Sequence, residues 1–97
     1  MLNITASKKG TTLTVFLEGA LDRNTSETAA ERIKSEMAGM EKLILDLEKL
    51  EYISSAGLRV LVDLRKRIGK RQNMAVKNVR QEVLDVFELT GLTKYLI

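Results

Sequence analysis

The sequence has no histidine and no cysteine. Imidazole-based catalytic relays, thiol nucleophiles and the usual zinc sites each need one of these side chains near neutral pH. Two adjacent serines, Ser54 and Ser55, remain as nucleophile candidates, but Ile53 stands where the nucleophile-elbow motif needs a glycine. No motif provides a lysine as a base for either serine. We therefore expect no enzymatic activity, no cofactor and no metal site.

Long apolar runs and proline are also missing. No apolar segment approaches the roughly 18 residues that span a bilayer, and the first lysines follow the first apolar residues, the reverse of a signal peptide. The absence of cysteine excludes a disulfide framework. We expect a cytoplasmic protein with no membrane insertion.

Aromatic residues are scarce, at 4% of the chain, although the net charge is +3. The stretch from Arg59 to Arg80 is basic, with Asp63 as an isolated acid within its helical part, and no aromatic residue is interleaved with its cations. A stacking platform for single-stranded nucleic acid is therefore absent. We expect no direct nucleic-acid partner, and we interpret the basic stretch as a solvated face or as a docking surface for an acidic protein.

The residues that are present alternate between strand and helix patterns. A chain of 97 residues that is 44% hydrophobic suits one domain, residues 1–97. Alternation predicts two hairpin strands joined at Gly10, and apolar spacing predicts three helices that end near Gly39, Gly69 and Gly91. The expected strands are 2–7, 12–19, 42–47 and 73–79, and the expected helices lie within 20–37, 58–68 and 80–90.

This order predicts an α/β fold with a small mixed sheet of about four strands and helices packed on it. The run at 42–47 is nearly continuously apolar, which is typical of a strand buried on both faces, and 73–79 is predicted as a third buried strand. Asn24, Thr25 or Ser26 is expected to cap the first helix. The remaining residues, 93–97, form a short terminal piece.

The serine pair lies where the strand 42–47 gives way to the helix 58–68. Serine is a common N-cap, and one serine is enough for that role. A helix N-terminus also tolerates an anion, so a phosphate on the second hydroxyl would change the surface at little cost to the fold. Both interpretations, a cap alone and a modification site, remain open from the residues themselves.

The segment "LDLEKLEYISSAGLRVL" resembles the signature of the STAS domain, and "LEGALDRNTSE" resembles the second motif of that family. The resemblance covers essentially the whole chain and implies the STAS fold. Among bacterial anti-sigma factor antagonists the pattern is commonly Asp-Ser-Ser/Thr-Gly-Leu, and the serine after the aspartate is phosphorylated. The resemblance thus implies Ser55 as the phosphoacceptor, with Ser54 at the aspartate position as second choice, followed by Ala56, Gly57 and Leu58.

Asp22 matches a family aspartate on a neighbouring loop, beside the docking site of a partner kinase, and Asn24 and Thr25 follow on that loop. From the residues alone Asp22 also suits a turn or a helix entry. The resemblance implies partner contacts at Asp22, Asn24, Thr25, Ser54, Ser55, Ala56, Gly57 and Leu58.

The function implied by the resemblance is that of an anti-sigma factor antagonist. Unphosphorylated, it would bind an anti-sigma factor serine kinase and release the sigma factor; phosphorylation at Ser55 would end binding, and a serine phosphatase would restore it. STAS domains also serve as accessory subunits of lipid-transport ABC systems and as scaffold components of stress-signalling assemblies. A STAS domain with no attached sensor or transporter segment favours the antagonist, as does a serine at the acceptor position.

Overall fold

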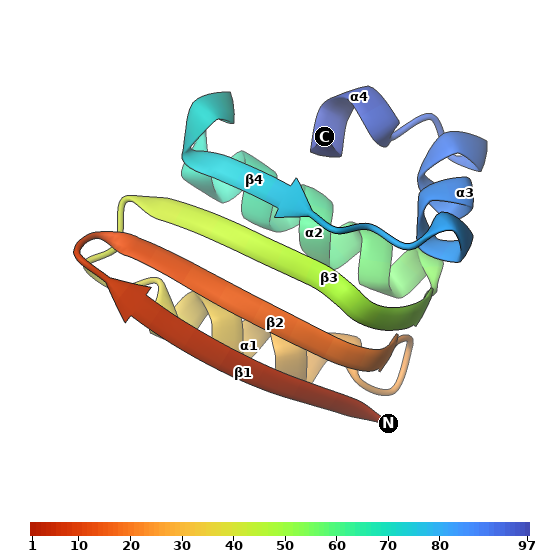
Figure 1. Ribbon diagram of the computed structural model, residues 1–97, viewed down its shortest axis with the longest axis horizontal. Coiled ribbons are helices and arrows are strands. Elements are labelled where there is room, and N and C mark those ends of the chain that lie inside the picture. The colour runs from red at the N-terminus through yellow and green to blue at the C-terminus, as the bar shows by residue number, and fades with distance from the viewer.

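The computed structural model describes all residues, 1–97, and has four strands and four α-helices (Figure 1). This confirms the predicted α/β class with a mixed four-stranded sheet. A short 3₁₀ helix, Arg71–Asn73, precedes the last strand. The elements are β1 (Leu2–Lys9), β2 (Thr12–Leu21), α1 (Ser26–Glu36), β3 (Lys42–Ile53), α2 (Ser55–Ile68), β4 (Met74–Lys77), α3 (Gln81–Leu89) and α4 (Thr93–Leu96).

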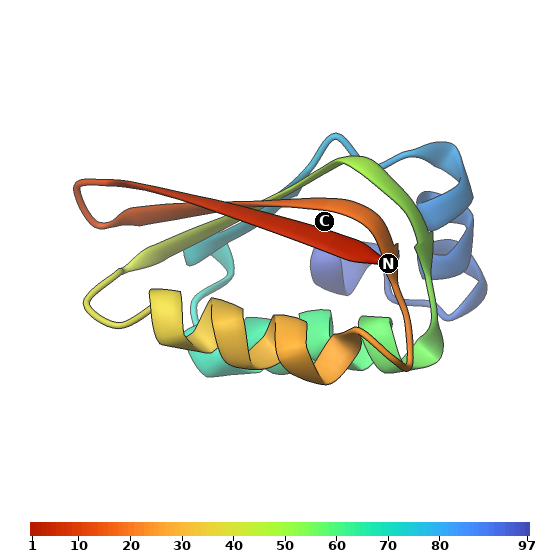
Figure 2. The same cartoon turned by 90° about the horizontal axis from the view of Figure 1, so that it is seen from below.

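The sheet follows the chain order, β1-β2-β3-β4. β1 and β2 form the predicted hairpin, and Gly10 takes the positive φ of 61° that its turn requires. β2, β3 and β4 are parallel, so α1 and α2 are crossover helices that both step in the same direction across the sheet. Because such crossovers are right-handed, the two helices lie on one face of the sheet (Figure 2).

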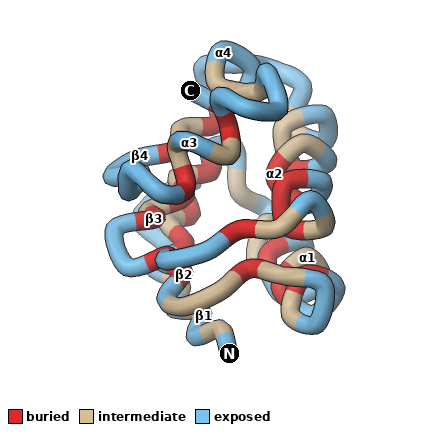
Figure 3. Tube along the Cα trace, turned by 90° about the vertical axis from the view of Figure 1, so that its right-hand side faces the viewer, coloured by how far each residue is buried: buried red, intermediate tan, exposed pale blue.

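The core lies between that face and the two helices, where the buried segments in Figure 3 concentrate. Leu13, Val15 and Leu17 all point into it, as the alternation in β2 predicts. No helix has the length and the apolar character needed to cross a membrane.

The expectation that 42–47 is buried on both faces is wrong. Leu43 and Leu45 are buried, but Ile44 and Asp46 between them are only half-buried, and the neighbouring Phe16 of β2 is 42% exposed. The reason is the topology: with both crossovers on one side, no helix covers the middle of the other face. The last strand is also shorter than expected, Met74–Lys77, and the terminal piece folds as α4.

Candidate functional site

The two serines have different roles at the start of α2. Ser54 is the N-cap residue, and its hydroxyl oxygen accepts a hydrogen bond from the N–H of Gly57 at 3.2 Å. Ser55 is the first residue of the helix, and its side chain is exposed. The cap therefore needs Ser54 alone, and the hydroxyl of Ser55 remains available to another molecule.

The end of β2 lies directly against this helix start. The carbonyl oxygen of Leu21 accepts a hydrogen bond from the N–H of Ser54 at 3.0 Å. A Cβ at Gly57 would lie 2.5 Å from the same oxygen and 2.8 Å from the Ile53 side chain. Glycine is thus required here by the close approach of two backbones, because any larger residue would separate α2 from β2.

The loop after β2 is organised by Asp22. Its carboxylate oxygen Oδ1 accepts hydrogen bonds from the N–H groups of Asn24 at 2.9 Å and Thr25 at 3.1 Å. The Thr25 hydroxyl accepts from the N–H of Asp22 and donates to the Ala20 carbonyl, both at 2.9 Å. Of the three cap candidates, Thr25 takes the N-cap position of α1, but its side chain holds the loop and makes no capping bond.

These hydrogen bonds set the charge state of Asp22. Partial desolvation raises its pKa, but the N–H groups of Asn24 and Thr25, the Thr25 hydroxyl and the positive chain N-terminus together outweigh that effect. The pKa of Asp22 therefore lies below its ordinary value, and the loop carries a fixed negative charge at neutral pH.

A groove of about 570 Å³ runs between the first turns of α1 and α2. Ser55 and Ala56 line it from α2, and Arg59 and Asp63 follow one and two turns further along. Arg23, from the loop after β2, also lines the groove. The groove is open, mixed in charge and lined at one end by Ser55, which suits a protein surface better than an enclosed small-molecule site.

The structure brings both sequence motifs to one end of the molecule, but their residues differ in solvent exposure. Asn24 and Ser55 are exposed, and Asp22, Thr25, Ser54 and Ala56 are half-buried. Gly57 and Leu58 are buried, Leu58 with only 4% of its surface exposed. Both residues therefore support the helix start from beneath, and their role in partner contact stays a prediction.

Part of the basic stretch has a structural role that the sequence did not reveal. The guanidinium of Arg65 lies 5.7 Å from the centre of the Tyr95 ring. Arg71 donates hydrogen bonds to the carbonyl oxygens of Lys94, at 2.6 Å, and Ile97, at 2.9 Å. Both arginines therefore fasten α4 to the body of the domain.

Comparison with known proteins places the chain in a family. The model of the STAS domain matches residues 3–96. The chain belongs to the STAS domain family. A Bordetella bronchiseptica protein named as an anti-sigma factor antagonist, BtrV, is 31% identical over 96 residues, which cover 93% of this chain and 79% of that protein.

Solved structures agree on the STAS fold. An anti-sigma factor antagonist from Mycobacterium paratuberculosis has a TM-score of 0.88 at 23% identity, over 99% of this chain and 83% of that chain. SpoIIAA of Bacillus has been solved in its unphosphorylated form, with a TM-score of 0.82 at 18% identity over 98% of this chain and 86% of that chain. The phosphorylated form of SpoIIAA has a TM-score of 0.74 at 17% identity, over 98% of this chain and 89% of that chain.

This STAS domain departs from the antagonist motif at Ser54, in place of aspartate, and at Ala56, in place of serine or threonine; the first departure has a simple structural reason. Serine and aspartate are both strong N-cap residues, because each presents an oxygen that can accept from the N–H groups of the first turn. Ser54 makes that bond to Gly57. The substitution therefore preserves the cap while it removes one negative charge beside Ser55.

Proposed function

We propose that this STAS domain is an anti-sigma factor antagonist that is switched off by phosphorylation of Ser55. The observation that carries the proposal is that the two serines have different roles at the helix start. Ser54 caps α2, and Ser55 beside it is exposed at the head of an open groove. The names of BtrV and of the solved relatives support the same role.

The unphosphorylated surface is suited to a protein partner. The Asp22 loop presents exposed Asn24 and a fixed negative charge, and the groove between α1 and α2 begins at Ser55. In this proposal the partner is an anti-sigma factor that is also a serine kinase, and binding of the antagonist releases the sigma factor. The kinase binds ATP and transfers its γ-phosphoryl group to the Ser55 hydroxyl, with release of ADP and a proton.

Phosphorylation would act on this surface without unfolding the domain. A phosphate on Ser55 adds about −1.5 to −2 charges at the N-terminus of α2, where the helix dipole favours negative charge. The capping bond from Gly57 to Ser54 needs no rearrangement. The added charge would lie at the centre of the partner contact, where an unpaired buried charge costs several kcal/mol. A serine phosphatase would remove the phosphate and restore binding.

The test is intact-mass spectrometry of the chain purified from its own cells, followed by fragmentation to locate any phosphate. We expect one phosphate on Ser55 in part of the population. Ser55→Ala should abolish it and remain bound to the kinase, whereas the matched variant Ser54→Ala should still be phosphorylated. A phosphate on Ser54 would contradict the assignment, and a single unmodified mass under all growth and stress conditions would contradict the switch.

The identity of the bound ATPase separates this function from the alternative. The tagged chain should co-purify with an ATPase that phosphorylates it in the presence of ATP. Co-purification with the ATPase of a transporter, and no phosphorylation, would instead assign the chain as an accessory subunit of a lipid-transport ABC system.

A further inference from the structure

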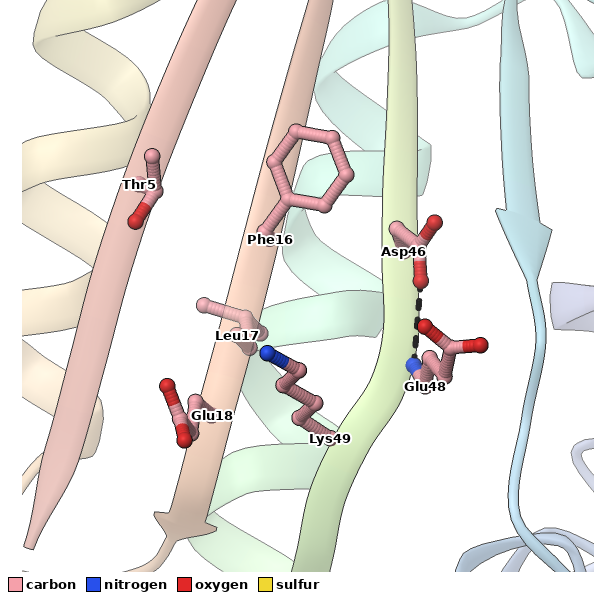
Figure 4. Close-up of a pocket in the computed structure, with 7 residues that line it drawn as sticks. All are labelled: Thr5, Phe16, Leu17, Glu18, Asp46, Glu48 and Lys49. Atoms are coloured by element: carbon pink, nitrogen blue, oxygen red, sulfur yellow. Dashed lines mark hydrogen bonds between the residues drawn. The ribbon is translucent and has the colours of Figure 1, made fainter.

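The sheet face opposite α1 and α2 is left open by the topology. The register places its side chains in rows across the strands, and the central row is neutral, with Thr14 of β2 beside Ile44 of β3. The next row contains Phe16, 42% exposed, beside Asp46. Figure 4 shows this part of the face, a shallow cavity of about 210 Å³ lined by Thr5, Phe16, Glu18, Asp46, Glu48 and Lys49.

Charge on this open sheet face is asymmetric along the strands. At the end where β2 and β3 begin, Lys9 and Lys42 lie in one row with Thr12. At the other end, the cavity contains three carboxylates and one lysine. Lys77 lies in the row of Asp46 but on the outer strand β4. The face is therefore basic at one end, neutral in the middle and acidic over the cavity.

Both edges of the sheet are protected, in contrast to the face. On the β1 edge, Arg32 of α1 donates a hydrogen bond to the Ile4 carbonyl at 3.2 Å, and Lys8 lies 3.4 Å from Glu36. The opposite edge strand, β4, has only four residues. Short or blocked edges prevent strand addition. An association of this sheet is therefore expected through its face.

We propose that the open sheet face binds a second copy of the chain, face to face, with the strands of the two copies antiparallel. A two-fold axis that passes across the sheet at Ile44 would bring Lys42 of each copy over Asp46 of the other, because both lie two residues from Ile44 along β3. The basic end of one copy then faces the acidic cavity of the other. A parallel arrangement would instead oppose like charges.

Asp46 is already held in position for this contact. Its carboxylate accepts hydrogen bonds from the N–H of Glu48 and from the side-chain amide of Asn78, each at 3.0 Å (Figure 4 shows the first). A fixed carboxylate loses little conformational freedom when a cation binds. The lysine that meets it, Lys42, makes no ion pair within its own copy.

The size of the face sets the expected strength. With strands about 4.8 Å apart and a rise of about 3.3 Å per residue, four strands and the eight residues of β1 give a projected area of roughly 500 Å². Two copies therefore bury on the order of 1,000 Å², at the low end for specific interfaces. We expect a dimer that dissociates in the micromolar range. The Ser55 groove lies on the helix side and stays free, so the dimer does not depend on the proposed switch.

The test is sedimentation equilibrium of the full chain over a range of concentrations. Lys42→Glu alone and Asp46→Lys alone should each raise the dissociation constant at least tenfold, since each creates two like-charge contacts across the axis. The double variant Lys42→Glu with Asp46→Lys should return it to within about threefold of the original. Circular dichroism and thermal melting check that each variant is folded.

A separate variant keeps the test independent of Asp46. Ile44→Lys puts two cations together at the axis and should abolish the dimer, whereas Leu89→Lys, at an 86% exposed position on α3, should not change it. A monomer at all concentrations up to about 1 mM would overturn the proposal. So would a dimer that ignores the charge exchange, or a face that becomes protected from hydrogen exchange only when a different protein is added.

Discussion

The carbonyl oxygen of Leu21 accepts a hydrogen bond from the N–H of Ser54, with 3.0 Å between the two atoms. This bond joins the last residue of β2 to the cap of α2, and the two residues belong to the two separate sequence motifs. It fixes the Asp22 loop beside the exposed hydroxyl of Ser55. The candidate site is therefore one rigid unit built from two distant segments.

Gly57 should be the least replaceable residue of this unit. In Gly57→Ala the new Cβ would lie 2.5 Å from the Leu21 carbonyl oxygen, and a backbone atom held in a sheet cannot move aside cheaply. We expect a loss of about 2 kcal/mol or more in the free energy of unfolding, measured by urea denaturation. Asp63→Ala, at an exposed position of the same helix, is the control and should change stability by less than about 0.5 kcal/mol.

The two serines should differ in their effect on stability. Ser54→Ala removes the acceptor for the Gly57 N–H and should cost about 1 kcal/mol, whereas Ser55→Ala should stay within about 0.5 kcal/mol. Ser54→Asp should keep the stability, because aspartate is an equally good cap. Equal losses for the two alanine variants in urea denaturation would mean that the cap is shared.

The charge of Asp22 should make the loop sensitive to acid. Its pKa is lower in the folded chain, so its contribution to stability is fully present above the unfolded pKa, about 3.9, and is lost as the pH falls through the lower folded value. Asp22→Asn should therefore unfold at lower urea than the original chain at pH 7, and the gap should narrow once the pH falls below the unfolded pKa. Carboxyl NMR titration measures the pKa of Asp22 directly.

Arg71 should control the docking of α4. Its two hydrogen bonds reach carbonyl oxygens at and beyond that helix, at exposed positions, so their loss should cost about 1 kcal/mol locally. We expect Arg71→Ala to speed hydrogen exchange in α4 about fivefold, while α1 stays unchanged. Arg67→Ala, which removes a neighbouring exposed cation, is the control. Unchanged exchange in α4 would show that burial of Leu96 alone holds the helix.

Periodicity was enough to predict the four strands and the first three helices in their order, but not the short helix α4. The alternation of Leu13, Val15 and Leu17, and the glycines that end the helices, depend on local geometry and are visible in one sequence. Which face of the sheet is covered is not a local property. It follows from two crossovers that both step in the same direction across the sheet. For this reason the apolar run at 42–47 led to the wrong prediction that both faces of the strand are buried.

The candidate site was predictable in its residues but not in their roles. The serine pair was visible, yet only the structure separates the cap from the exposed hydroxyl, because the choice depends on where the helix begins. The burial of Leu58 and the Leu21 contact of Gly57 depend on a strand more than thirty residues away. The anchors made by Arg65 and Arg71 are likewise contacts with a distant segment.

The parallel pairing of β2 with β3 has a consequence for newly made chains. The Asp22 loop and the Ser54 cap meet only after α1 has crossed over and the two strands have aligned, since Leu21 and Ile53 are partners in that register. A chain that is partly folded, misaligned or cleaved within α1 has both motifs but no assembled site. In the proposed function, only a correctly folded chain would therefore present the docking surface to a partner.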